Sequence, residues 1–395
     1  MIKFGIPNIT KKEHTAIKQV LESKWLTTGK TVEIFENKFK KYKRSKFATG
    51  VSSCTDALHM SLLSLKLKKN DEIITSAMTF CSAINVIENV GARPVLVDIK
   101  KDTLNIDPDK IEKKITKKTK AIIIVHFAGM PCEMEKILKI TKKYNIKLIE
   151  DCAHSIEAKY KRTHVGNFGF SGCFSFYANK NITTAGEGGM ILCKNKILNN
   201  YFKKLSLHGM SKEAWKRFDI KKNYHNYDLE FPGLKNNMTN VQASMGIVQL
   251  NKIEKLWTLR EKIYLNYQNF FKNYDVGIQL PSEGFTNYKH AYHLFVLYFK
   301  DNKKFNIRNK LIKFLKKKQI GFGIHYRSIN DLKFYRKKYK WNKKTAPNAY
   351  HIGSNIISLP LQPDLTIKEQ KFILSQLKIF FSSFKNKKIN YHGNI

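Results

Sequence analysis

The run Lys147-Leu148-Ile149-Glu150-Asp151-Cys152-Ala153-His154 places two carboxylates directly after a short apolar segment. Residues 147–149 have the composition of a buried strand, so Asp151 stands just past the end of that strand. A buried carboxylate is unfavourable unless a cation or hydrogen bonds compensate it. Taken alone, Asp151 is equally consistent with a cap on the next helix and with a ligand contact.

A second stretch, GCFSFYANKNITT (172–184), changes that balance. It is an aromatic, strand-like run that ends at Lys180 and is followed by hydroxyl residues and by GEGG (186–189). A lysine after a strand usually faces solvent. Here the neighbouring hydroxyl, aromatic and glycine residues are suited to holding a phosphorylated ring, so Lys180 becomes a candidate functional residue.

Outward from these stretches, helical and strand patterns alternate from residue 2 to residue 246. The expected strands are residues 72–76, 93–97, 121–125 and 147–149, and the expected helices are 11–21, 32–43, 56–65, 82–89 and 133–144. Alternation of this kind predicts an α/β fold with a large, mostly parallel sheet covered by helices, in which ligands gather at the carboxyl ends of the strands. Residues 1–246 are therefore predicted to form the large domain.

After Met238 the pattern changes. Residues 239–271 form one periodic segment that predicts a long connecting helix. Strands at 291–298 and 320–324 and helices at 305–317 and 367–381 then predict a smaller α+β domain over residues 247–385. Residues 386–395 are polar and are expected to be a tail.

The 72 Lys and Arg residues against 31 Asp and Glu give a formal net charge of +41. The lysines are spread along the whole chain, and no nucleic-acid-binding motif accompanies them, so no nucleic-acid partner is expected. No apolar run has the length of a signal peptide or a membrane span, and the six cysteines are isolated. These features predict a cytoplasmic protein without a membrane segment, with reduced thiols and no metal site.

The motifs EDCAHS (150–155), FSFYANKNITT (174–184) and GEGGM (186–190) together resemble the DegT/DnrJ/StrS family of sugar aminotransferases. Further matching segments follow in the family's order: KWLTTGKTVEIFENKF (24–39), SSCTDALHMSL (52–62), MTFCSAINVI (78–87), VHFAGMPCEM (125–134), LHGMSKEAWKRF (207–218), PGLKNNMTNVQASMG (232–246) and GIHY (323–326). The resemblance implies the fold type I of pyridoxal-phosphate-dependent transferases and pyridoxal 5′-phosphate as cofactor.

The resemblance also implies roles for individual residues. Lys180 is expected to anchor the cofactor covalently and then to transfer protons, Asp151 to pair with the ring nitrogen, and His154 to lie near the phenolic oxygen. His154 is alternatively a satisfied core histidine. Phe80 is expected to stack on the ring, although it could equally belong to the core.

The phosphate is expected at a helix start, on the backbone N–H groups of Cys54, Thr55 and Asp56, with hydroxyls of Thr55 and Ser175 nearby. Asn237 resembles a residue that reaches the phosphate from a partner subunit, which implies a homodimer with shared active sites. Candidate substrate contacts are Thr28, Lys161, Arg162, His325 and Arg327.

Two positions depart from the family pattern. Relatives commonly have glycine where Cys54 stands, so the phosphate loop is expected to differ in shape. Ala185-Gly186 replaces a single glycine in many relatives, which predicts a local bulge after the lysine loop.

The implied reaction transfers the amino group of L-glutamate to a nucleotide-linked keto sugar, with a 4-keto sugar favoured by LHGMSKEAWKRF and KNNMT. One alternative is a sugar 3-dehydratase of the same fold, but those enzymes carry histidine at the position of Lys180. A second alternative is a regulator that binds the cofactor without turnover. The presence of Lys180, Asp151 and His154 together disfavours it.

Overall fold

The computed structural model describes residues 1–211, 228–273, 277–280, 282, 287–300 and 306–389. Its centre is a seven-stranded sheet with the order β1-β9-β8-β5-β4-β2-β3. The strands are β1 (Phe47–Val51), β2 (Glu72–Ser76), β3 (Arg93–Val97), β4 (Thr119–Val125), β5 (Lys147–Asp151), β8 (Ser171–Ser175) and β9 (Gly189–Cys193). Strand β9 runs antiparallel to both of its neighbours, β1 and β8, and every other pair in this sheet is parallel. The mostly parallel sheet confirms the predicted α/β fold class.

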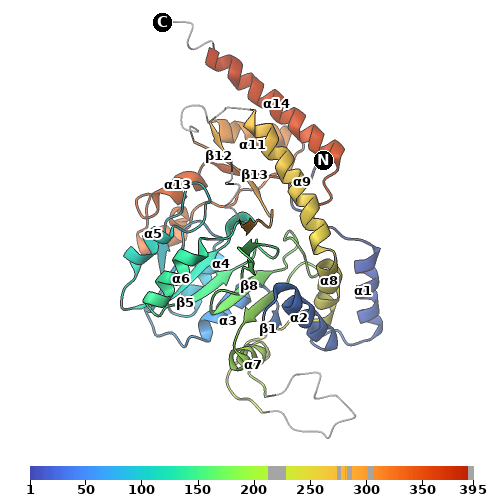
Figure 1. Cartoon of the computed structure of the whole chain (residues 1–395), viewed down its shortest axis with the longest axis vertical. Coiled ribbons are helices and arrows are strands. Elements are labelled where there is room, and N and C mark those ends of the chain that lie inside the picture. Colours follow the sequence, from blue (N-terminus) through green and yellow to red (C-terminus); the bar gives the residue numbers. More distant parts are fainter. Residues whose placement is uncertain (212–227, 274–276, 281, 283–286, 301–305, 390–395) are drawn as a thin grey trace.

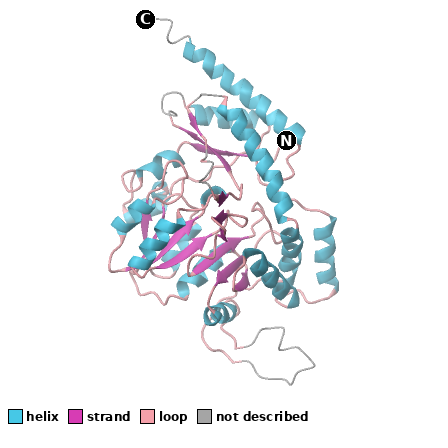
Figure 2. Cartoon of the chain, in the orientation of Figure 1, coloured by secondary structure: helices cyan, strands magenta, loops and turns pink. Residues whose placement is uncertain are grey.

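Helices pack around this sheet on both sides (Figures 1 and 2). They are α1 (Lys11–Glu22), α2 (Lys30–Lys43), α3 (Cys54–Leu63), α4 (Ser82–Asn89), α5 (Pro108–Ile111), α6 (Met134–Lys143), α7 (Lys196–Leu205) and α8 (Asn240–Asn251). Hydroxyl caps fix several of their starts. Thr10 and Thr239 both form capping boxes, and the Ser53 side chain accepts a hydrogen bond from the Asp56 amide.

The strands are nearly continuous apolar runs because both faces of the sheet are covered. Ile73, Ile74, Ile122, Ile123 and Ile149 are all completely buried. Burying each such side chain contributes roughly 1.5–3 kcal/mol relative to leaving it exposed. This core holds the strand ends rigidly, and the strand ends in turn position the loops that follow them.

The remaining part of the chain forms a smaller layer above the sheet (Figure 1). It contains a three-stranded antiparallel sheet with the order β10-β12-β13. Its elements are α9 (Ile253–Lys272), β10 (Ile278–Gln279), β12 (Phe295–Phe299), α11 (Ile307–Lys317), α12 (Lys333–Tyr339), α13 (Pro347–Gly353), β13 (Ile356–Leu359) and α14 (Ile367–Ile389). A third small sheet joins β6 (Lys159–Tyr160), β7 (Thr163–His164) and β11 (Tyr288–Lys289).

The expected single helix over 239–271 is wrong in one respect, because it is broken into α8 and α9. Lys252 leaves the helical conformation at φ −108° and ψ 6°. Its ammonium binds the Glu13 carboxylate at 2.6 Å and donates to the Asn8 carbonyl at 2.9 Å, near the N-terminus. Tertiary contacts with the N-terminal segment therefore accompany the break.

Two further expectations need correction. Residues 320–324 form isolated bridges, Ile2 with Ile320 and Gly323 with Ser358, rather than a strand. Helix α14 continues to Ile389, past the expected start of the tail at 386, and residues 390–395 lie outside the described residues. The domain division at residue 246 remains a prediction. In the described ranges, no helix combines the length and apolarity needed to cross a bilayer.

Candidate active site

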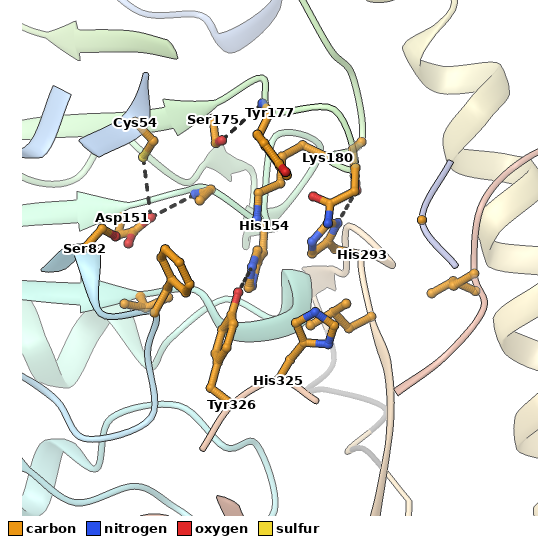
Figure 3. Close-up of a pocket in the computed structure, with 18 of the residues that line it drawn as sticks. Cys54, Ser82, Asp151, His154, Ser175, Tyr177, Lys180, His293, His325 and Tyr326 are labelled. Carbon is orange, nitrogen blue, oxygen red and sulfur yellow. Dashed lines mark hydrogen bonds between the residues drawn. The ribbon is translucent and has the colours of Figure 1, made fainter. Parts of the chain in front are cut away.

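A cavity of about 520 Å³ opens at the carboxyl ends of the central strands. Asp151 ends β5 and Ser175 ends β8, while Cys54 and Phe80 follow β1 and β2 closely. Because parallel strands bring their carboxyl ends to one edge, residues far apart in sequence meet here. Lys180 also lines the cavity, and Figure 3 shows its side chain pointing toward the same space as Asp151 and His154.

The loop that carries Lys180 is closed by backbone hydrogen bonds. The Phe176 amide donates to the Gly188 carbonyl at 2.8 Å, and the Ala178 amide donates to the Gly186 carbonyl at 2.9 Å. Ala185 and Gly186 both have positive φ, at 60° and 107°. Ala185-Gly186, which replaces a single glycine of many relatives, therefore takes a left-handed turn, for which glycine at the second position is favourable.

Asp151 is buried and Lys180 is half-buried, and loss of contact with water displaces the pKa of each group. Loss of water lowers the pKa of Lys180 to about 8, although the Asp151 charge partly opposes the shift. Burial likewise raises the pKa of Asp151, while the Ala153 amide and the Lys180 charge act in the opposite direction. Among the described residues these two groups form no direct ion pair. The space between them is therefore available to a ligand that contacts both.

His154 is fixed in one tautomer. The Ala128 amide donates to its Nδ1 at 3.3 Å, so Nδ1 carries a lone pair. Burial, followed by the charge of Lys180, lowers the pKa of His154 well below its usual value, so the ring is neutral. Its proton is therefore on Nε2, which lies 2.9 Å from the Tyr326 hydroxyl and donates to it. Tyr326 can then direct its own proton elsewhere.

The other predicted cofactor contacts fall into two groups. Phe80 is 57% exposed and lines the cavity, with its ring 5.8 Å from that of Tyr326, so it presents a free aromatic face. Cys54, Thr55 and Ser175 also line the cavity. Cys54 and Thr55 occupy the first turn of α3, where backbone N–H groups have no intrahelical acceptor.

Asp56 does not support its predicted role. It is absent from the residues that line the cavity, and its amide donates to Ser53 Oγ at 3.1 Å. Its carboxylate accepts from Ser53 Oγ and from Asn236 Nδ2. Asp56 therefore organises the start of α3, and the amides available to an anion are those of Cys54 and Thr55.

Four of the five predicted substrate contacts lie away from this chain's cavity lining, and only His325 belongs to it. Lys161 pairs with Glu135, and Arg327 pairs with Asp331 at 2.6 Å. Arg162 is exposed in the turn between β6 and β7. Thr28 donates to the Met238 carbonyl and accepts from Asn237 Nδ2, so Thr28 and Asn237 form a separate pair.

Several lining residues were missed by the sequence reasoning, among them Ser53, Tyr177, Asn181, Glu187, His293, Tyr326 and Gln362. Tyr326 lies within the quoted GIHY motif and could have been nominated with His325. His293 and Gln362 come from segments that the sequence marked only as strand or left unassigned. No sequence signal connected them to Lys180. The LHGMSKEAWKRF motif lies partly outside the described residues, from residue 212 onward.

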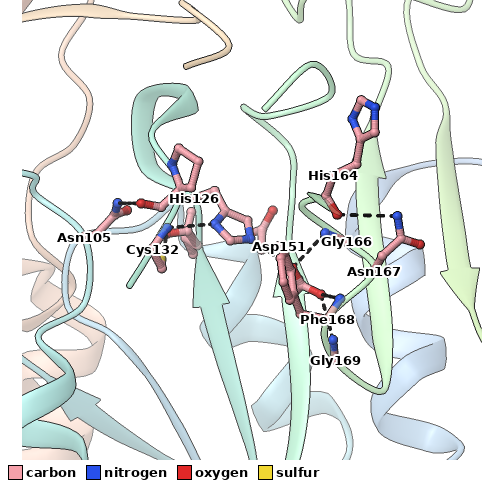
Figure 4. Close-up of polar contacts among 12 residues, drawn as sticks. Asn105, His126, Cys132, Asp151, His164, Gly166, Asn167, Phe168 and Gly169 are labelled. Atoms are coloured by element: carbon pink, nitrogen blue, oxygen red, sulfur yellow. Dashed lines mark hydrogen bonds and ion pairs between the residues drawn. The ribbon is translucent and has the colours of Figure 1, made fainter. Parts of the chain in front are cut away.

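A second buried cluster lies beside the cavity (Figure 4). The Cys132 amide donates to His126 Nδ1, so His126 Nε2 donates to Glu150 at 3.2 Å. The Glu150 carboxylate also accepts from the amides of Gly166, Phe168 and Gly169 at 2.7–2.8 Å. His126, Glu150 and Cys152 are close enough to be considered as metal ligands. However, both His126 nitrogens and the Glu150 oxygens already have protein partners, which explains the cluster as structural.

The cavity residues fit pyridoxal 5′-phosphate. They supply a half-buried amine, a buried acid, an exposed aromatic face, and a helix start next to hydroxyl groups. The hydroxyl of Thr79 is buried without a partner among the described residues and lines the same cavity. Each group matches one part of the cofactor: aldehyde, ring nitrogen, ring face and phosphate.

Comparison with known proteins agrees with this geometry. The DegT/DnrJ/EryC1/StrS aminotransferase family matches residues 7–378. This chain belongs to that family. An uncharacterized protein, MJ1066, of Methanocaldococcus jannaschii is 44% identical over 91% of this chain and 92% of its own length. The spore coat polysaccharide biosynthesis protein SpsC of Bacillus subtilis is 37% identical over 92% and 93%.

Among solved structures, the putative sugar aminotransferase Spr1654 from Streptococcus pneumoniae has a TM-score of 0.89 at 31% identity. The similarity covers 97% of this chain and all of that one. Spr1654 was solved in PLP and PMP forms. The predicted recognition, fold type and enzyme class are therefore confirmed: the chain is an aminotransferase of the sugar-aminotransferase family, and its cofactor is pyridoxal 5′-phosphate.

Proposed function

We propose that this aminotransferase moves the amino group of L-glutamate to a nucleotide-linked keto sugar, with a 4-keto sugar as the favoured acceptor. The observation that carries the proposal is the placement of the half-buried Lys180 and the buried Asp151 in one cavity at the strand ends. The cavity volume of about 520 Å³ is in the range of small-molecule sites.

Lys180 is suited to both of its roles. With a pKa of about 8, part of its population is the neutral amine at physiological pH, and only the neutral amine is nucleophilic. That amine would hold the aldehyde of pyridoxal phosphate. It would also accept and return a proton at the substrate carbon, as a general base and acid.

Asp151 holds a proton or a negative charge opposite the amine. When bound, pyridoxal phosphate withdraws electrons from the substrate carbon and so makes its proton acidic. Asp151 would keep this electron withdrawal strong by holding the ring nitrogen. His154 donates to Tyr326, which fixes both side chains at the edge of the cavity. Phe80 would cover a ring face and exclude water from it.

The substrate pair is supported by charge and by the relatives. A nucleotide diphosphate sugar and glutamate are both anionic, and a net charge of +41 raises the encounter rate with anions. SpsC, which shares 37% identity, is described as a polysaccharide biosynthesis protein. We extend that role to this chain and place the amino sugar product in polysaccharide assembly in the cytoplasm.

A homodimer is also part of the proposal. Asn237 does not line this chain's own cavity, and its side chain bonds Thr28 and Lys235 instead. This location supports a role for Asn237 at the phosphate site of a second copy. Light scattering and a mixed-variant complementation test between Lys180→Ala and Asn237→Ala chains address it directly. Recovered activity in the mixture requires sites shared between subunits.

The test of the reaction starts with protein reconstituted with pyridoxal phosphate. Borohydride reduction followed by peptide mapping should label Lys180. Addition of L-glutamate should then convert the bound cofactor to its amine form, seen as loss of its visible absorbance. UDP-, dTDP- and GDP-linked 4-keto sugars should each be offered next, and the true acceptor restores the absorbance and yields an amino sugar by mass spectrometry.

The outcomes separate the alternatives. A protein that keeps its absorbance with glutamate is a cofactor-binding regulator and contradicts the proposal. A protein that releases water from the sugar without gaining nitrogen is a dehydratase. An unlabelled Lys180 after reduction would overturn the assignment of the anchor.

A further inference from the structure

A line of buried polar groups reaches the cavity from behind Lys180. Arg260 of α9 pairs with Glu157, and their side chains are 3% and 0% exposed. The other Glu157 oxygen accepts from Asn181 Nδ2 at 2.7 Å. Asn181 Oδ1 lies 2.8 Å from His293 Nδ1. Helix α9 is thereby connected to a histidine that lines the cavity.

The direction of each hydrogen bond in this line follows from the partners. Asn181 Nδ2 faces two groups that only accept, the Glu157 carboxylate and the Ala291 carbonyl. These two acceptors fix the orientation of the Asn181 side-chain amide, with Nδ2 toward them and Oδ1 toward His293. An oxygen can only accept, so His293 Nδ1 carries the proton. The remaining nitrogen of a neutral His293, Nε2, then bears a lone pair.

His293 is neutral for the same reasons as His154. Burial lowers its pKa well below the usual value, and the charges of Lys180 and Arg260 act in the same direction. Its ring stacks on that of His154, with centroids 4.4 Å apart and planes at 29°. Figure 3 shows His293 next to Lys180 at the edge of the cavity. Within the described ranges no group donates a hydrogen bond to His293 Nε2.

We propose that His293 Nε2 accepts a hydrogen bond from a hydroxyl of the bound sugar. Asn181 holds the tautomer of His293 directly, and Glu157 and Arg260 hold Asn181, so these three are positioning residues for this contact, although Asn181 and Arg260 also line the cavity. The inference rests on the proposed function, and it names a contact that selects for the acceptor substrate.

The chemistry favours the sugar over glutamate as the donor of this bond. A neutral imidazole with a lone pair offers no positive charge to a carboxylate, so it is unsuited to the two carboxylates of glutamate. The single donor group of glutamate is its ammonium, which must lie at the reacting position beside Lys180. A hexose ring, in contrast, carries several hydroxyl donors around the carbonyl that reacts.

The first experiment measures the tautomer and does not depend on turnover. Holoenzyme labelled with ¹⁵N-histidine is compared by NMR with its His293→Gln variant, which identifies the His293 signals. We expect a protonated Nδ1 and an unprotonated Nε2 at neutral pH. Asn181→Ala should shift the signals toward a mixture of tautomers. A wild-type His293 protonated on Nε2, or on both nitrogens, would overturn the proposal.

The second experiment follows ligand binding at the same signal. UDP-glucose and dTDP-glucose, which carry hydroxyls but no keto group, are titrated into the labelled holoenzyme to saturation. A sugar hydroxyl on Nε2 should move the Nε2 signal upfield, and UDP or dTDP alone should not. If saturating nucleotide sugars leave the signal where the nucleotides alone leave it, the contact does not exist. This readout decides the proposal even where no keto sugar is converted.

The third experiment separates the two half-reactions. His293→Phe keeps the ring stacked on His154 but removes the acceptor, while His293→Gln offers a carbonyl oxygen in its place. Loss of one hydrogen bond, roughly 1.4 kcal/mol, should raise the KM of the keto sugar about tenfold in His293→Phe. The rate with glutamate should stay within about threefold, and His293→Gln should recover part of the loss.

His290→Phe is the matched control for the kinetic experiment. His290 is buried three positions earlier in the chain, but it does not line the cavity, and its Nδ1 accepts from the Tyr292 amide. Its replacement should leave the KM of the sugar unchanged in folded protein. Equal losses in both half-reactions for His293→Phe would contradict the sugar contact. An inactive wild-type enzyme, in contrast, would refute the proposed function and leave the NMR results to judge His293.

Discussion

Glu150 and Asp151 are consecutive residues of β5, and both are buried, at 0% and 4% exposure, yet they do different things. Glu150 accepts hydrogen bonds from His126 and from three backbone amides. Burial alone would raise the pKa of Glu150, but these bonds outweigh it and the pKa falls. The pKa of Asp151 rises, because the Ala153 amide and the Cys54 thiol compensate its burial only in part.

The difference shows what distinguishes a site from a core. A carboxylate whose oxygens are all satisfied by the protein is a structural element that holds a loop in place. A carboxylate that the fold leaves partly unsatisfied, facing a cavity, is prepared for a ligand. Neighbours in a strand face opposite sides of the sheet, so one residue step separates the two roles.

The largest effect is expected at Lys180. Lys180→Ala should abolish covalent cofactor attachment and reduce turnover by roughly 10⁴-fold, because both the anchor and the proton carrier are lost. In the wild-type protein the rate of cofactor attachment should rise with pH through about 8, as the amine loses its proton. Absorbance after mixing with pyridoxal phosphate at a series of pH values measures this rate.

Lys43 provides the control for Lys180. Burial lowers its pKa to about 8 as well, but its amine donates to the Ile156 carbonyl and does not line the cavity. Lys43→Met should therefore leave attachment of the cofactor intact. A lost label in Lys43→Met, or a retained label in Lys180→Ala, would contradict the assignment.

Asp151→Asn should reduce turnover about 100-fold, because an amide cannot hold a positive charge on the ring nitrogen. The same change should leave the cofactor-free protein equally stable or about 1 kcal/mol more stable at neutral pH. The sign follows from the raised pKa of Asp151. Protonated Asp151 contributes to the free energy of unfolding. That contribution is lost as the pH rises through the folded-state pKa of Asp151. Urea unfolding of both proteins measures it, and a large loss of stability would contradict the comparison.

Glu150→Gln should show the reverse pattern. Its amide group would face backbone donors, so the free energy of unfolding should fall by about 2–4 kcal/mol at pH 7. Because the folded-state pKa of Glu150 is lowered, its contribution is complete above its ordinary value of about 4.3 and disappears as pH falls through the folded-state value. The difference in the free energy of unfolding between the wild-type protein and Glu150→Gln, measured with urea, should therefore become smaller at acid pH. Cofactor attachment in the folded variant should persist.

The smallest effect is expected at Cys54, whose Sγ lies 3.7 Å from Asp151 Oδ1. Cys54→Ala removes this weak donor and should lower turnover by only about twofold to fivefold, since a thiol is a poor hydrogen-bond donor. The accompanying readout is the pH at which the absorbance of the bound cofactor changes, which should shift in the variant. Cys54→Ser should restore the wild-type value, and an unchanged pH in Cys54→Ala would remove Cys54 from the site.

The sequence predicted those elements whose patterns are local. Residues 72–76, 93–97 and 82–89 are β2, β3 and α4 with the expected bounds, because each is a short run with its own start and stop signals. The strand expected at 291–298 begins only at Phe295, and β13 was not predicted. Both belong to the small sheet, in which pairing partners lie far apart in the sequence.

The sequence by itself identified the family, and it predicted the anchor and its acid partner, because strand ends and short motifs indicate which chemical groups can meet a cofactor. Lys180, Asp151, His154 and Phe80 were all identified in this way. Only the tertiary structure decided that Asp56 organises a helix, that the Tyr326 hydroxyl accepts a hydrogen bond from His154, and that His293 lines the cavity. The physical reason is that a tautomer or an unsatisfied oxygen depends on partners from distant segments, and nothing in the local sequence specifies those partners.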